Sequence, residues 1–109
     1  MNPKDFDKIV EQRRARIVAI LTAKGKEYAT DADRLHNFKV SAAFAGTTPV
    51  YECWAFNRKH LVSIMDMVNA QNQGKRFTSA QWDEKIGDAI NYLILLEALL
   101  KESIDAQGK

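Results

Sequence analysis

The sequence predicts an all-α protein, a compact bundle of four main helices. Apolar residues recur at steps of three and four along most of the chain, which is the period of an amphipathic helix. Capping residues, proline and glycine stand at the ends of these stretches and mark helix boundaries. We find no stretch with the alternating pattern of a strand.

The first helix is expected to run from Asn2-Pro3 to Lys24-Gly25. Asparagine caps a helix well and proline suits its first position, whereas glycine readily ends it. Residues 26–30 are expected to form a connector. We expect Thr30 or Asp31 to cap a second helix that ends at Gly46.

The third helix is expected to begin after Thr48, with Pro49 at its first position, and to end at Gly74. Its main apolar stripe is expected to contain Trp54, Leu61, Met65 and Val68.

Thr78 and Gln81 have the spacing of a capping box and predict the start of a fourth helix that ends near residues 106–108. Its apolar positions are Trp82, Ile86, Ala89, Leu93, Leu96 and Leu100. We expect both tryptophans in the core.

Short connectors favour antiparallel neighbours, so we expect residues 1–109 to form a single helical domain. Two helices are apolar over more than one stripe, which favours a homodimer.

Composition narrows the function classes. The net charge of +2 is far from the basic excess typical of nucleic-acid binders, so we expect no nucleic-acid partner.

The longest apolar stretch, 89–100, contains Asn91 and Glu97 and is too short to cross a membrane. Cys53 is the only cysteine, which rules out an intrachain disulfide. The N-terminal residues lack the apolar segment of a secretory signal, and we expect a cytoplasmic location.

A polar stripe on the fourth helix is the main candidate for chemistry. Glu84, Asp88 and Asn91 are spaced i, i+4 and i+7 and therefore share one edge of the helix. Neighbouring carboxylates repel each other, and a hard cation such as Mg²⁺ would relieve this repulsion. The alternative is a set of ordinary ion pairs with nearby lysine or arginine residues.

The third helix offers residues to face this stripe. Glu52 is either a third metal ligand or an acid that favours the start of its helix. Lys59 lies on the same face as Glu52 and either holds a phosphate or neutralises an acid. His60 is either an acid–base group or a hydrogen-bonding residue of the helix surface.

The polar segment between the first two helices is a further candidate. It contains Lys24, Tyr28, Arg34 and Asn37. It contributes to a site if it folds over the acids of the fourth helix, and is otherwise a solvated loop.

Two motifs carry a family resemblance. Residues 24–28, Lys-Gly-Lys-Glu-Tyr, resemble the Lys-x-x-Asp-Tyr element of the nucleotide-modification-associated domain family of phages and bacteria. Residues 83–92 resemble the C-terminal segment of that family, an acid followed by Asp-x-x-Asn-Tyr. More distantly, Ile86-Gly87-Asp88 is similar to a Glu-Leu-Gly-Asp turn of the MazG-like all-α nucleotide pyrophosphatases. The resemblance covers about residues 20–100 and implies a MazG-like bundle encoded by a phage and located in the cytoplasm of its bacterial host.

The resemblance implies binding of a nucleotide and Mg²⁺-dependent cleavage of a nucleoside triphosphate to a monophosphate and pyrophosphate. The metal ligands would be Glu52, Glu84 and Asp88. The nucleotide would contact Lys24, Tyr28, Arg34, Asn37, Lys59, His60, Asn91 and Tyr92. The MazG-like enzymes carry a Glu-x-x-Glu pair on one helix and Glu-x-x-Asp on another. Here the third helix has only Glu52, and Lys85 occupies the place of a second glutamate.

Two other functions are open at this point. The same scaffold, with fewer acids, suits a nucleotide-binding module without catalysis. Alternatively, the chain is a helical phage module that binds a protein partner, and its polar stripe is a network of ion pairs.

Overall fold

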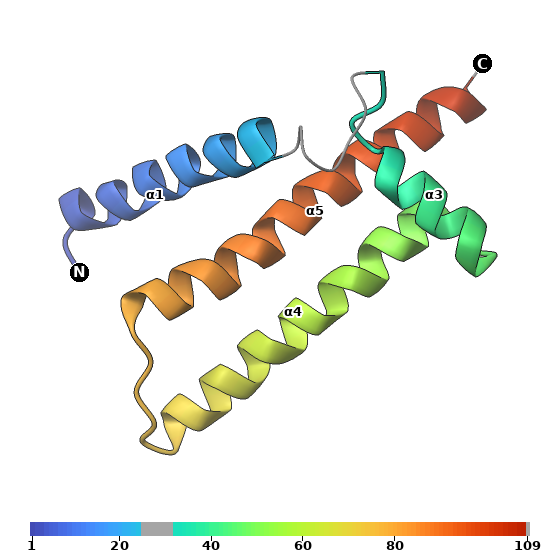
Figure 1. Cartoon of the computed structure of the whole chain (residues 1–109). Helices are drawn as coiled ribbons and strands as arrows, with labels where there is room; N and C mark the ends of the chain where they lie inside the picture. The colour runs from blue at the N-terminus through green and yellow to red at the C-terminus, as the bar shows by residue number, and fades with distance from the viewer. Residues whose placement is uncertain (25–31, 109) are drawn as a thin grey trace. The chain divides into compact units, whose positions relative to one another are not determined.

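The computed structural model describes residues 1–24 and 32–108. The protein is all-α over these ranges, which form four α-helices and contain no strand. The predicted fold class is confirmed at this level (Figure 1). None of the helices in these ranges combines the length and the hydropathy that a bilayer crossing requires.

The chain divides into two compact units, residues 1–36 and 37–109, and each is described by itself. In the first unit, helix α1 (Pro3–Val18) continues directly into the π-helical segment η1 (Ala19–Lys24). The Asn2 side chain accepts a hydrogen bond of 2.8 Å from the Asp5 backbone N–H. The predicted start of the first helix is therefore confirmed. None of the residues of α1 is buried.

Helix α3 (His36–Ala45) begins later than the sequence predicts. The caps expected at Thr30 and Asp31 lie outside the described residues. Asp33 instead accepts a 3.0 Å hydrogen bond from the Leu35 backbone N–H, just before the helix. Gly46 ends α3 with φ +70°, a conformation that suits glycine because it has no Cβ.

Helices α4 (Pro49–Asn72) and α5 (Ser79–Gln107) form an antiparallel hairpin (Figure 1). The Thr48 side chain caps α4, and Thr78 and Gln81 form the complete capping box of α5. Gly74 has φ +99° in the short connector between them. These caps and both glycine positions confirm the sequence prediction.

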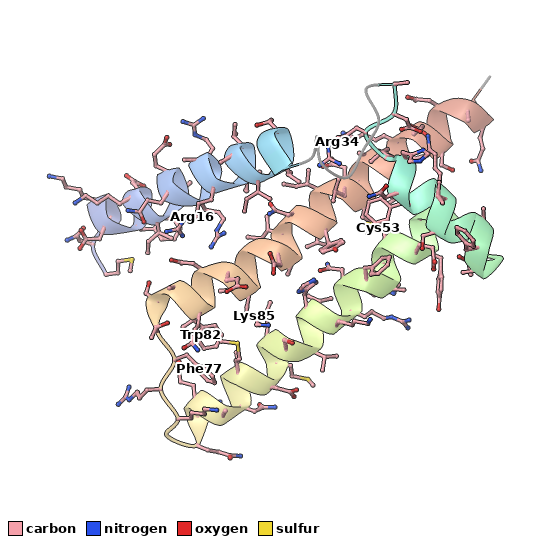
Figure 2. All side chains as sticks on the ribbon, in the orientation of Figure 1. Arg16, Arg34, Cys53, Phe77, Trp82 and Lys85 are labelled. Atoms are coloured by element: carbon pink, nitrogen blue, oxygen red, sulfur yellow. The ribbon has the colours of Figure 1, made fainter. Side chains whose placement is uncertain are left out.

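Small, polar and apolar side chains are all buried where the two helices of the hairpin meet. Cys53 and Asn57 of α4 are almost completely buried, as are Ala89 and Leu99 of α5. The Asn57 Nδ2 donates a 3.3 Å hydrogen bond to the Ala89 carbonyl of α5. Cys53, labelled in Figure 2, donates its thiol to the Tyr92 carbonyl at 3.5 Å.

Helix α3 packs at the end of the hairpin where α4 begins. The Phe38 ring makes edge contacts with the Phe56 and Tyr92 rings, at centroid distances of 6.5 and 6.4 Å. The Lys39 ammonium lies 2.6 Å from a carboxylate oxygen of Glu102 in α5.

The apolar stripe expected to face the core of the third helix is exposed instead. Trp54 keeps 41% of its surface accessible, and Leu61, Met65 and Val68 are exposed as well. The prediction that Trp54 lies in the core is therefore wrong, because α4 turns its Cys53–Asn57 side toward α5. Trp82 is partly buried near the connector (Figure 2), with its ring 5.5 Å from that of Phe77.

Candidate functional site

The hairpin brings three of the predicted site residues together: His60 of α4 with Asp88 and Tyr92 of α5. We call these residues the α4–α5 cluster. The His60 Nδ1 lies 3.9 Å from the Asp88 Oδ2, which is an ion-pair distance when the imidazole is protonated but too long for a hydrogen bond. The His60 and Tyr92 rings are stacked, with centroids 5.1 Å apart and planes 27° from parallel.

The antiparallel pairing explains this convergence. Asp88 and Tyr92 are four residues apart on α5 and lie on one face, one turn apart. His60 is four residues from Phe56 on α4, and the Phe56 ring is stacked 6.5 Å from Tyr92. Tyr92 therefore contacts two successive turns of α4. All three residues of the cluster are half-buried, so their polar atoms are held in place while part of each side chain stays accessible.

Two buried amide oxygens lie on the same turns. Asn57 and Asn91 are buried, and the Oδ1 atom of each has no hydrogen-bond partner. Asn91 is three residues from Asp88 on α5, and Asn57 is three residues from His60 on α4. A buried polar atom without a partner costs about 1–3 kcal/mol. Such atoms are uncommon in folded proteins and call for an explanation.

The predicted magnesium ligands do not converge. The Ser41 hydroxyl donates a 2.9 Å hydrogen bond to Glu52 at the start of α4. The neighbouring residue Cys53 lies level with Tyr92, which is eight residues along α5 from Glu84. Those eight residues correspond to about 12 Å of helix, so the hairpin separates Glu52 from Glu84.

The described ranges therefore do not bring the three predicted carboxylates together into one magnesium site. Residues 1–24 and 32–108 contain no group of three or more His, Cys, Asp or Glu side chains placed to hold a metal. Glu84 is exposed one turn before Asp88, and this pair is what remains of the predicted carboxylate set.

The other predicted contact residues lie in different places. Lys59 is exposed on α4, next to His60. Asn37 is exposed in the first turn of α3. In the first unit, the Arg34 guanidinium donates a 3.2 Å hydrogen bond to the Leu21 carbonyl, and Arg34 is labelled in Figure 2. Tyr28 and the side chain of Lys24 lie outside the described residues.

Sequence reasoning missed the roles of Cys53 and Asn57. Their i, i+4 spacing places them on one face of α4, but larger apolar residues nearby suggested a different buried face. Burial raises the pKa of the Cys53 thiol from 9.0 to about 11. This thiol is therefore protonated at neutral pH, and it is not an activated nucleophile.

No protein-family model, no curated protein and no solved structure matches this chain. The resemblance to the nucleotide-modification-associated family and the MazG-like arrangement of the helices therefore stay predictions.

Proposed function

We propose that this protein binds a nucleotide at the α4–α5 cluster. The observation that supports this proposal is the convergence of an imidazole, a carboxylate and a phenol from two helices. A nucleotide supplies the complementary groups: a flat aromatic base, amino and hydroxyl donors, and negatively charged phosphates.

Each residue of the cluster has a role in this proposal. Base–aromatic stacking typically contributes about 1–3 kcal/mol per base, and the half-buried His60 ring, whose other face stacks on Tyr92, offers the surface for it. The Asp88 carboxylate accepts hydrogen bonds from the base or the sugar. The exposed ammonium of Lys59 attracts the phosphates.

The proposal includes no catalytic step through a metal, because the described ranges contain no group of three or more His, Cys, Asp or Glu side chains placed to hold one. Pyrophosphate release that depends on Mg²⁺ stays a prediction of the family resemblance. Pyrophosphate release is measured separately, in the same samples that are used for the binding experiment.

Isothermal titration calorimetry of the full chain tests the proposal. The ligands are a panel of canonical and modified deoxynucleoside triphosphates, each titrated with and without Mg²⁺. We expect saturable binding of at least one nucleotide. We also expect the nucleotide to raise the melting temperature, because a ligand at one hundred times its Kd increases the free energy of unfolding by about 2.7 kcal/mol.

The matched variants are Asp88→Asn in the cluster and Glu97→Gln elsewhere on α5, where Glu97 is paired with Lys101 at 3.1 Å. We expect D88N to weaken binding at least about tenfold, because it removes the negative charge and replaces one of the two accepting oxygens by an NH₂ donor. We expect E97Q to bind as the natural protein does. Equal binding by both variants would place the nucleotide elsewhere. The absence of any binding would contradict the proposal.

A helical interaction module is the second candidate function. It is favoured by a different observation, the exposed apolar side chains along the hairpin.

A further inference from the structure

The α4–α5 hairpin exposes large apolar side chains along both of its helices. On α4 these residues are Trp54, Leu61, Met65 and Val68. On α5 they are Ile86, Leu93, Leu100 and Ile104. Each exposes between 37% and 62% of its surface. We call these residues together the apolar face.

The two halves of the apolar face lie on one side of the hairpin. Asn57 is three residues after Trp54 and four before Leu61. Ala89 has the same relation to Ile86 and Leu93. Residues three and four apart share a helix face, so the hydrogen bond between the Asn57 amide and the Ala89 carbonyl joins the two stripes.

Helix α3 contacts the opposite side of the hairpin. It reaches Glu52 through Ser41 and Glu102 through Lys39. Glu52 is two residues from Trp54, and Glu102 is two residues from Leu100. Two residues correspond to about 200° around a helix. The contacts with α3 therefore leave the apolar face open.

The spacing within the apolar face is that of a helical bundle. Trp54, Leu61 and Val68 are spaced i, i+7 and i+14 on α4, and Ile86, Leu93 and Leu100 have the same spacing on α5. A heptad repeat of apolar residues is the seam along which helices pack at shallow angles. The hairpin carries two such seams side by side.

The size of the face matches a dimer interface. Residues 54–68 and 86–104 correspond to about 21 and 27 Å of helix, and two adjacent helices are about 20 Å wide. The projected area is about 500 Å², to which protruding side chains add accessible surface. A stable interface buries about 800 Å² per partner, and an apolar patch of this extent is as large as the largest patch on a typical monomer, which is often an interaction site.

We propose that a second copy of this chain docks on the apolar face, so that two α4–α5 hairpins form a four-helix bundle. A single partner helix would cover one of the two seams, whereas another hairpin covers both. The eight residues that define the face are uncharged, so burying them in a self-complementary contact requires no ion pair. Two residues of opposite charge lie among them, since Arg58 is four residues after Trp54 and Glu97 is four residues after Leu93. Glu97 is paired with Lys101 at 3.1 Å.

The test uses two substitutions of the same kind on neighbouring exposed residues of α4. Met65 is 55% exposed on the apolar face. Val62 is 51% exposed and lies five residues, or about 140°, from the buried Asn57, so it points away from α5. Sedimentation velocity and light scattering over a wide concentration range give the mass of the full-length natural protein and of the Met65→Glu, Leu93→Glu and Val62→Glu variants.

We expect the natural protein and V62E to have twice the 12.4 kDa chain mass. We expect M65E and L93E to raise the dimer dissociation constant at least about a hundredfold, because an unpaired carboxylate would be buried. Circular dichroism checks that all variants keep their helix content.

A natural protein that stays monomeric at every concentration would overturn the proposal. Equal effects of M65E and V62E would overturn it too, because they would show that the face is not the contact surface. The proposal is independent of nucleotide binding, since the α4–α5 cluster and the apolar face use different residues.

Discussion

Cys53 shows how a single small residue determines the geometry of the hairpin. It is fully buried and contacts the α5 backbone at the Tyr92 carbonyl. A larger side chain at this position would hold α4 and α5 apart and would separate His60 from Asp88. The cluster therefore depends on a residue that has no polar role of its own in it.

We predict that the Cys53 thiol is protected from alkylation in the folded protein. Iodoacetamide should react at least about tenfold more slowly with the native chain than with the chain in denaturant, because the thiol is buried and largely protonated. Mass spectrometry of timed samples measures the two rates. Equal rates would mean that the hairpin opens readily around Cys53.

The raised pKa of Cys53 also predicts a dependence of stability on pH. Below pH 9.0 the thiol is protonated in both folded and unfolded chains and has no effect. From there to about pH 11 the unfolded chain loses the proton first, so the free energy of unfolding falls as the pH rises. Urea unfolding at several pH values should show a smaller fall for Cys53→Ala than for the natural protein. Identical curves would contradict the assignment.

At the scale of the elements, helix boundaries were largely predictable and buried faces were not. Asn2, Thr48 and Thr78 cap their helices as expected, because a cap is a contact between residues close in sequence. The buried face of α4 depends on a distant helix. Its apolar residues occupy more than one face, so periodicity alone did not distinguish the Trp54 side from the Cys53 side.

We predict that loss of the capping box destabilises the hairpin. In the Thr78→Ala variant the Gln81 backbone N–H loses its 3.1 Å acceptor, and we expect a cost of about 1 kcal/mol. Thr47→Ala is the control, since Thr47 is exposed beside a cap without being one, and we expect less than about 0.5 kcal/mol for it. Urea denaturation gives both values. A T78A cost no larger than that of T47A would contradict the prediction.

The candidate site was predicted in part, and the reason lies at the scale of the whole molecule. The sequence placed Asp88, Asn91 and Tyr92 on neighbouring turns of one helix, and this relation is local. It also grouped Glu52 with Glu84, but whether these two residues lie close together depends on the register between α4 and α5. The contacts of Cys53 and Asn57 with the α5 backbone determine which residues of α4 lie opposite which residues of α5. These contacts join residues far apart in sequence, and the sequence alone did not predict them.

If the apolar face joins two copies, thermal stability must depend on protein concentration. We predict that the melting temperature of the natural protein rises with concentration, because dilution favours the separated chains. The M65E variant should show a lower melting temperature that is independent of concentration. Scanning calorimetry at several concentrations measures both. A natural protein with a constant melting temperature would contradict a dimer linked to folding.

The two tryptophans of the chain stand at opposite ends of the hairpin. Trp54 lies near the start of α4 with its indole exposed, and Trp82 lies in the first turn of α5 against Phe77. The protein thus carries two intrinsic fluorophores in different surroundings: the Trp54 indole is exposed to solvent, and the Trp82 indole packs against the Phe77 ring. In a separate chain, emission at longer wavelengths would come mainly from Trp54, and docking of a second copy on the apolar face would shift that emission to shorter wavelengths, so events at the two ends of the hairpin would be distinguishable without any added dye.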